Sequence, residues 1–266
     1  MAKKDKSEYI IQSVSHALDL LEEFQGDADE LGVTELSKRL KLHKNNVFRL
    51  LATLESRGYI EQNKATENYR LGLKSLELGQ TFIRQMGLLR QARPVMESLV
   101  EACNETTYVG IVRENYVVYL DVVEAKQTVR VVNRVGARLP VYCTAMGKAQ
   151  LAYESEDEIE RLLPAKELKR YTENTITELP KLLEHLRKVA EQGYAVDDRE
   201  FEPDVKCVAV PIRDYTRRVV GGISVSAPAI RLPQERIERE LAPLVKKAGA
   251  EISARLGYEI GLGAAG

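Results

Sequence analysis

Hydrophobic residues recur at helical spacing near the start of the chain and predict a short first helix. Its apolar stripe is formed by Val14, Ala17, Leu18 and Leu21. The pattern ends at QGDADELG, where glycine and aspartate favour a loop. A second short helix follows, and Thr34 stands at its N-cap position, where a hydroxyl accepts a free backbone N–H.

Only the residues KLH separate the second helix from a third, which we expect to begin at Lys44 or Asn45 and to stop at Gly58. The inward face of this third helix is Val47, Leu50, Leu51 and Leu54. Two helices joined by such a short turn form a helix-turn-helix. The strand-like runs GYIEQ and NYRLG, joined by the polar NKATE, then predict a two-stranded hairpin, the wing.

From Lys74 onward a helical pattern continues until Pro94, and we interpret it as a linker helix. Beyond Pro94 the pattern favours strands, predicted at TTYVGIVR, YVVYLDVVEA, TVRVV, CVAVPIRD and RRVVGGISVSA. Helices are predicted at about 144–153, 156–163, 178–192 and 233–256, with Ser155 and Thr177 as N-caps and Gly193 as a C-terminal stop. This grouping of strands and helices predicts an α+β sandwich.

Composition excludes disorder and fibres, because 44% of the 266 residues are hydrophobic, enough to fill real cores. No apolar run approaches a membrane span, and the N-terminus lacks a signal-peptide pattern, so we expect a cytoplasmic protein with no membrane partner. The three cysteines are Cys103, Cys143 and Cys207, and their wide spacing favours reduced thiols over disulfides or a zinc site. We predict no metal and no cofactor.

Charge is segregated although the net charge is only −1. Residues 1–37 hold three Lys or Arg against nine Asp or Glu, whereas residues 38–74 hold nine against three, so the net charge changes from −6 to +6. A basic segment with a polar helix start suits the phosphates and base edges of double-stranded DNA. Two alternatives stay open from these residues alone: a solvated surface helix, and a winged helix that contacts protein or RNA.

The chain closely resembles the IclR family of bacterial transcriptional regulators from about Val14 to Leu256. The resemblance is carried, in order, by TELSKRLKLHKNNVFRLLATLESRGYIEQ, YRLG, LPVYCTAMGKAQLA, GYAVDDREFEP and CVAVPIRD…VVGGISVSAP. It implies an N-terminal winged helix-turn-helix, a linker helix and a C-terminal GAF-like antiparallel sheet with flanking helices. It also implies a dimer or tetramer that binds a palindromic operator, and an effector that changes this binding.

These patterns together divide the chain into five parts. They are a disordered tail at 1–8, a DNA-binding domain at 9–73, a linker helix at 74–93, an effector-binding domain at 94–258 and a flexible tail at 259–266. Within the DNA-binding domain we expect contacts from Thr34, Lys44, Asn45, Asn46, Arg49, Arg57 and Lys64.

One departure from the family falls at the start of the third helix. Where the family usually reads Gly-Leu-Pro-Lys-Ser-Thr, this chain has KLHKNN, so His43 replaces a proline and Asn45 and Asn46 replace hydroxyl residues. Asparagine presents a donor and an acceptor that match the edge of adenine. We therefore expect Asn45 or Asn46 to read an A·T pair.

The motif LPVYCTAMGKAQLA places Ala145 and Gly147 at a helix start, where free N–H groups favour an anion such as a carboxylate. Close packing of that helix start against the sheet is the alternative from the residues alone. The family resemblance implies an effector pocket here. Its expected lining is Val131, Leu139, Ala145, Met146, Asp197, Cys207, Ser224 and Ser226. Pyruvate-like and aromatic acids both suit this mixture of apolar, hydroxyl and acidic groups.

An enzyme that uses Cys207 or Cys143 on a small molecule is the rival function. A nucleophilic thiolate needs a basic partner, and of the three histidines only His185 falls in the same part of the chain. The sequence therefore favours buried structural cysteines and a protein that is not an enzyme.

Overall fold

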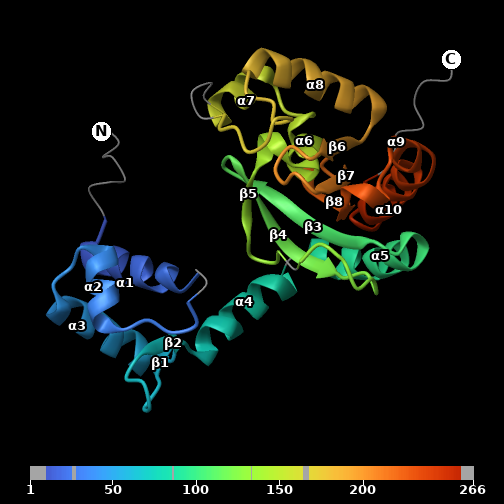
Figure 1. Cartoon of the computed structure of the whole chain (residues 1–266). Helices are drawn as coiled ribbons and strands as arrows, with labels where there is room; N and C mark the ends of the chain where they lie inside the picture. Colours follow the sequence, from blue (N-terminus) through green and yellow to red (C-terminus); the bar gives the residue numbers. More distant parts are fainter. Residues whose placement is uncertain (1–9, 26–27, 86, 133, 164–167, 259–266) are drawn as a thin grey trace. The chain divides into compact units, whose positions relative to one another are not determined.

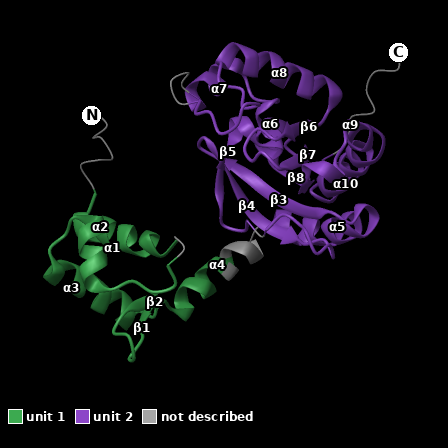
Figure 2. Ribbon diagram, viewed as in Figure 1, with its two compact units in different colours: residues 1–85 green, residues 86–266 purple. Residues whose placement is uncertain are grey.

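The structure of the chain is a computed structural model that describes residues 10–25, 28–85, 87–132, 134–163 and 168–258 (Figure 1). The tails predicted at 1–8 and 259–266 lie outside the described residues. The chain forms two compact units, residues 1–85 and residues 86–266 (Figure 2). Each unit has a hydrophobic core of its own.

The smaller unit is the winged helix-turn-helix that the sequence predicts. In chain order it contains α1 (Gln12–Glu22), α2 (Val33–Leu40), α3 (Lys44–Ser56), β1 (Ile60–Gln62), β2 (Tyr69–Leu71) and α4 (Leu73–Gln85). The strands β1 and β2 pair antiparallel as the wing. Leu20 from α1, Leu36 from α2 and Leu51 from α3 are fully buried against one another, so the three helices share one core.

The stripe predicted for the first helix is partly wrong. Val14 and Leu18 are 52% and 55% exposed, whereas Leu20 is buried and Phe24, in the 3-10 turn after α1, is 7% exposed. The helix carries two overlapping apolar stripes, and periodicity alone does not say which one meets the core. The predicted N-cap is also wrong: α2 begins at Val33 with Gly32 as N-cap, so Thr34 lies inside the first turn.

The larger unit is built on one antiparallel sheet. Its described elements are α5 (Gly87–Cys103), β3 (Thr106–Arg113), β4 (Tyr116–Val123), β5 (Arg138–Pro140), α6 (Ala145–Leu151), α7 (Glu156–Leu162), α8 (Leu179–Gln192), β6 (Ala195–Asp198), β7 (Val205–Arg213), β8 (Val219–Pro228), α9 (Gln234–Arg236) and α10 (Ala242–Arg255). The described strands lie in the order β5-β4-β3-β8-β7-β6. The helices α5 and α10 pack in the core on one face and α6 and α8 in the core on the other, which confirms an α+β sandwich (Figure 1).

Several local predictions for this unit need correction. Residues 128–132, the run TVRVV, form no strand, and the sheet instead contains the short strands β5 and β6. The helix expected at 233–256 is interrupted by a π-helical segment, Ile237–Leu241, between α9 and α10. Thr177 is not an N-cap, because α8 follows Glu178 and the Thr177 hydroxyl accepts a bond from Arg170 instead.

Other local predictions are confirmed. Ser155 caps α7 by accepting a bond from the N–H of Glu158, and Gly193 ends α8 with a left-handed φ of 76°. The linker prediction, in contrast, needs correction: Pro94 lies within α5 rather than at the start of a helix, so the segment 74–93 contains most of α4 and the first part of α5. Among the described helices, none is long and apolar enough to cross a membrane.

Candidate nucleic-acid interface and ligand cavity

The leading end of α3 presents a largely polar surface. Lys44, Asn45, Asn46 and Arg49 are exposed, while Val47 and its neighbours one turn apart, Leu51 and Leu54, are buried on the opposite face. The helix is thus held by its apolar side and leaves its first two turns free to meet a partner. This is the geometry of a recognition helix that enters the major groove.

The turn before α3 reproduces the backbone that glycine and proline favour. Lys41 ends α2 in the left-handed region at φ 53°, and His43 has φ −61°. These are the conformations of a helix-ending glycine and of a proline before a helix, so Lys41 and His43 replace the two family residues without changing the turn. The hydroxyl of Ser37 donates to the carbonyl of Leu42 at 2.6 Å and fixes the turn.

Phe48 is a surface residue that the sequence analysis did not assign. It is 56% exposed on α3, between Asn45 and Arg49 on the polar face. A large apolar ring among hydrogen-bonding residues is the available signal, because an exposed aromatic side chain there contacts no core. Its ring can meet the methyl group of a thymine, the apolar feature of the major groove.

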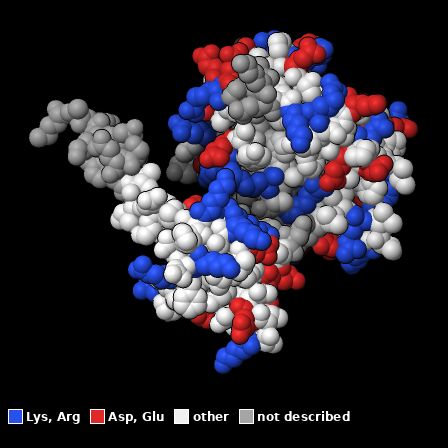
Figure 3. Space-filling model, turned by 60° about the vertical axis from the view of Figure 1, so that its left-hand side comes forward, with Lys and Arg blue, Asp and Glu red and all other residues white. Residues whose placement is uncertain are grey.

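The basic residues predicted to meet phosphate have no counterion among the side chains that the structure describes. Within the described ranges, the side chains of Lys44, Arg49, Arg57 and Lys64 form no ion pair, whereas Arg39 pairs with Glu35 and Arg70 with Glu61. Lys64 lies in the turn of the wing. On the face shown in Figure 3, acidic and basic side chains are interspersed over much of the molecule. Cationic side chains without an internal ion pair therefore indicate an anionic partner better than the overall charge distribution of the surface does.

The wing is attached to the body of the smaller unit through Glu30. Its carboxylate accepts hydrogen bonds from Asn63 at 2.7 Å and from Thr66 at 2.6 Å. Both bonds lower the pKa of Glu30, and the bond from Thr66 has the larger effect. Leu31 also forms a β-bridge with Tyr69 of β2. The turn of the hairpin and the start of β2 are thereby positioned before any nucleic acid binds.

The larger unit contains a small cavity beside one row of cross-strand neighbours in its sheet. Asp197 of β6, Cys207 of β7 and Ser226 of β8 are successive cross-strand partners, and the Ser226 hydroxyl donates to the Cys207 sulfur at 3.1 Å. The cavity is narrow, with a free volume of about 10 Å³. It is lined by Tyr119, Val131, Arg134, Leu139, Thr144, Asp197, Phe201, Glu202, Val205, Cys207 and Ser226.

The structure brings together part of the predicted effector set. The predicted residues that line the cavity are Val131, Leu139, Asp197, Cys207 and Ser226. Ala145, Met146 and Ser224 are each about 1% exposed but do not line it. Met146 instead packs against the glycines of the central strands, since a Cβ at Gly110 would lie 2.6 Å from its sulfur. These three residues belong to the packed core.

The start of α6 is closely packed rather than open. A Cβ at Gly147 would lie 2.2 Å from the carbonyl oxygen of Val141, so only glycine permits this approach. The N–H of Gly147 already donates to the Thr144 hydroxyl at 3.2 Å, and α6 has only seven residues. The alternative of close packing thus explains this glycine, and the charge that would attract an anion must come from elsewhere in the cavity.

Among the described residues that line the cavity, Arg134 is the one cation. Arg134 donates from Nη2 to Oε2 of Glu202 at 2.7 Å. Burial opposes the charge of Arg134, but the carboxylate of Glu202 outweighs this effect and the pKa of Arg134 is raised. Burial raises the pKa of Asp197 to about 7, against the attraction of Lys148. Asp197 therefore alternates between its neutral and charged forms near neutral pH.

A buried ion pair fixes the chain that follows β6. The side chain of Lys148, which is fully buried, reaches from α6 to pair with Glu200 and donates to the carbonyl of Val196 at 2.6 Å. The N–H of Glu200 in turn donates to Asp197 at 2.7 Å. Lys148 thereby sets the position of the acidic residues at the cavity without lining it.

The cysteines lack the features of a nucleophile. Burial raises the pKa of Cys207 to about 12 and also raises the pKa of Cys143, so both are neutral thiols at physiological pH. Burial lowers the pKa of the only histidine in this unit, His185, to about 4. No group of metal-ligating side chains occurs in the part of the chain that the structure describes.

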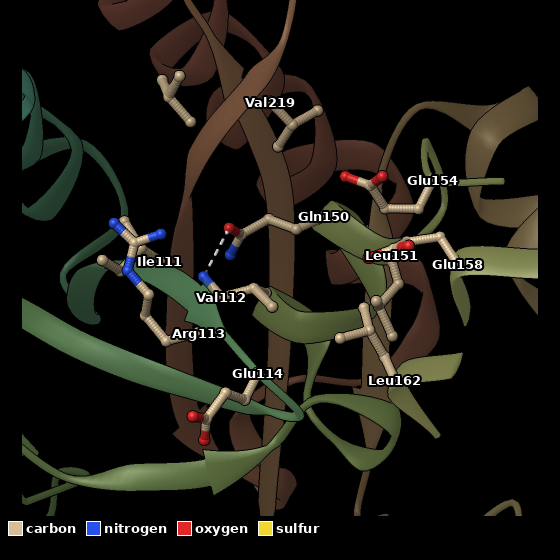
Figure 4. Close-up of a pocket in the computed structure, with 11 residues that line it drawn as sticks. Ile111, Val112, Arg113, Glu114, Gln150, Leu151, Glu154, Glu158, Leu162 and Val219 are labelled. Carbon is tan, nitrogen blue, oxygen red and sulfur yellow. Dashed lines mark hydrogen bonds between the residues drawn. The ribbon is translucent and has the colours of Figure 1, made fainter. Parts of the chain in front are cut away.

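A wider hollow of about 420 Å³ lies at another edge of the sheet (Figure 4). Arg113 and Glu114 border it from the end of β3, and Gln150 of α6 accepts a bond from the N–H of Val112 at 3.1 Å. Glu154 and Glu158 extend its acidic rim. Its lining contains none of the predicted effector residues.

Comparison with known proteins agrees with this architecture. Residues 13–64 match the IclR helix-turn-helix domain, and residues 80–254 match the bacterial transcriptional regulator IclR C-terminal domain. The chain belongs to the IclR family of bacterial transcriptional regulators. It is 37% identical to the HTH-type transcriptional regulator KdgR of Escherichia coli over 97% of both chains.

Solved structures of IclR proteins share the fold. An IclR regulator from Alicyclobacillus acidocaldarius has a TM-score of 0.83 at 28% identity and covers 94% of this chain and 100% of its own. An IclR homolog from Microbacterium hydrocarbonoxydans, solved in complex with 4-hydroxybenzoate, has a TM-score of 0.81 at 24% identity over 92% and 99% of the two chains. The chain is therefore a DNA-binding transcriptional regulator and not an enzyme.

Proposed function

We propose that this IclR regulator binds a small carboxylic acid in the cavity beside Asp197, Cys207 and Ser226, and that the acid changes its affinity for operator DNA. The observation that supports this is the convergence of a cation, hydroxyl groups and apolar side chains on one narrow cavity. The free volume of about 10 Å³ is smaller than a carboxylic acid, so binding requires lining side chains to move aside. To act on DNA, the acid must bind one arrangement of the protein better than another.

We further propose that the protein acts in the cytoplasm as a dimer or tetramer on a palindromic operator, which two recognition helices read. The residues that would contact DNA are Lys44, Asn45, Asn46, Phe48, Arg49, Arg57 and Lys64. The amide of Asn45 or Asn46 would form paired bonds with adenine, while the unpaired cations would meet phosphates. Thr34, in the first turn of α2, would add a phosphate contact.

Two experiments test this proposal. Selection from random duplexes identifies the operator, and Asn45→Ala and Asn46→Ala are expected to relax the preference at an A·T position by about 1–3 kcal/mol. Unchanged preference in both variants would contradict the assignment. Calorimetric titration of the full chain with pyruvate and with 4-hydroxybenzoate, repeated on the operator complex, tests the effector. An acid that binds and changes operator affinity supports the function, and binding without such a change refutes the coupling.

A further inference from the structure

The ion pair between Arg134 and Glu202 connects two loops across the ligand cavity. Arg134 lies between β4 and β5, and Glu202 lies between β6 and β7. The Arg134 side chain is 13% exposed, whereas that of Glu202 is 39% exposed. The cation is thus the inner partner of the pair and the carboxylate the outer one.

The backbone at Arg134 is fixed without help from Glu202. Arg134 begins a tight turn, in which the N–H of Ala137 donates to the Arg134 carbonyl at 2.8 Å and Gly136 has φ 82°. The N–H of Gly136 donates to the carbonyl of Tyr119 in β4 at 2.8 Å. The Tyr108 hydroxyl also donates to the carbonyl of Val132 at 2.5 Å. If Glu202 moved away, the turn that carries Arg134 would keep these bonds to the sheet.

The charges around the cavity leave this cation as the natural partner of an acid. Cys207 is a neutral thiol, Thr144 and Ser226 are hydroxyls, and Asp197 is neutral in part of the molecules near pH 7. A guanidinium has five N–H donors arranged to hold a carboxylate, and the bond to Glu202 uses the Nη2 end. Glu202 therefore occupies the place that the carboxylate of a ligand would take.

We propose that Arg134 binds the effector carboxylate and that Glu202 is an internal competitor which the effector displaces. This inference rests on the proposed function, because it assigns the anchor of the same small acid. Two carboxylates at one guanidinium repel each other, so the acid enters as Glu202 leaves. Its remaining atoms then contact the apolar wall formed by Val131, Leu139 and Val205.

The test compares each acid with its uncharged amide in wild type and Arg134→Gln. The probes are pyruvate with pyruvamide, and 4-hydroxybenzoate with 4-hydroxybenzamide, titrated calorimetrically into the full chain. A charge-assisted hydrogen bond makes wild type prefer the acid by about 10- to 150-fold, and Arg134→Gln loses this preference. The comparison of acid with amide within one variant removes any general effect of the substitution on the cavity.

Glu202→Gln tests the competitor separately and alters the more exposed partner. It is expected to bind the acid about 5-fold more tightly, the upper end for a partly exposed pair, and to gain less for the amide, which Glu202 does not repel. Arg130→Gln is the matched control for Arg134→Gln. Arg130 pairs with Glu124 at 2.7 Å in the same loop, but neither residue lines the cavity. Arg134→Lys, which keeps the charge, is expected to retain part of the preference if Arg134→Gln fails to fold.

The outcomes separate the two proposals. An unchanged preference for the acid in Arg134→Gln, or equal acid affinity of Glu202→Gln and wild type, overturns the role of this ion pair and leaves the small-acid effector standing. If neither acid binds wild type or Glu202→Gln, the small-acid proposal itself fails.

Discussion

Replacing Asp197 by asparagine should make the protein more stable at alkaline pH. In the folded chain Asp197 is 4% exposed, and burial raises its pKa from 3.8 to about 7. The titratable groups that interact with it are Lys148, Glu200, Cys143, Cys207 and Tyr119. The attraction of Lys148 only partly offsets burial. An amide carbonyl can still accept the bond from the N–H of Glu200, so asparagine removes the charge and keeps the geometry.

The sign and size of this stability change follow from the raised pKa of Asp197. Because the folded state holds its proton more tightly, the contribution of Asp197 is fully favourable below about pH 4 and is lost as pH rises to about 7. A difference of about 3 pKa units corresponds to at most about 4 kcal/mol at pH 8. The advantage of Asp197→Asn should therefore grow from pH 4 to pH 7 and stay constant above.

Urea denaturation of the full chain at pH 5, 6, 7 and 8 measures this difference. The neighbouring Asp198 is the matched control, because its ion pairs with Lys206 and Arg199 outweigh burial and lower its pKa. Asp198→Asn should lose stability above pH 4 instead of gaining it. If Asp197→Asn is no more stable than wild type at pH 8, or if its advantage is the same at pH 5 and pH 8, the argument from burial is wrong.

Three further substitutions test other parts of the fold. Gly147→Ala places a methyl group against the Val141 carbonyl and should lower the unfolding free energy, measured by urea denaturation, by about 3 kcal/mol. The control is Gly79→Ala, whose added methyl group has nothing within 4 Å and should be neutral or stabilising. Equal effects of the two substitutions would contradict the close packing at Gly147. His43→Pro fits φ −61° and should raise the unfolding free energy by about 0.4–1 kcal/mol, and a loss would show that the turn needs its N–H. Phe48→Ala should weaken binding of the selected operator, measured by fluorescence anisotropy, without altering acid binding; unchanged DNA affinity would remove Phe48 from the interface.

Sequence periodicity predicted the elements that are long enough to repeat a pattern. The helix α3 and the strands β3 and β4 each span eight or more residues, and their predicted positions are confirmed. The helix α3 buries one consistent face, whereas the first six residues of β3 are all buried. The strands β5 and β6, with three and four residues, are too short for an alternation to be visible. The run TVRVV has a strand-like composition but follows the cavity as a loop, with Val131 buried and Val132 71% exposed.

Local pattern also failed where a position depends on tertiary contacts. Val14 and Leu18 were predicted to face the core because their spacing is helical, yet the helix buries Leu20 instead. The π-helical segment Ile237–Leu241 has no distinct composition that would separate it from an α-helix. Such choices are made by the packing surface that a helix meets, which a single sequence does not contain.

The cavity also contains both a residue that a sequence motif identifies and a residue that only tertiary structure places there. The second residue changes which group is expected to bind an acid. The motif around Gly147 indicated an anion at a helix start, but Thr144 already accepts the N–H of Gly147 and the Val141 backbone leaves no room there. A cation for an acidic ligand is instead supplied by Arg134, which lies outside any helix or strand and 68 residues from its partner Glu202. Sequence periodicity does not identify such a residue, because its role depends on a turn that directs its side chain into the cavity. The positive charge that would favour an acid over a neutral ligand is therefore visible only in the folded structure.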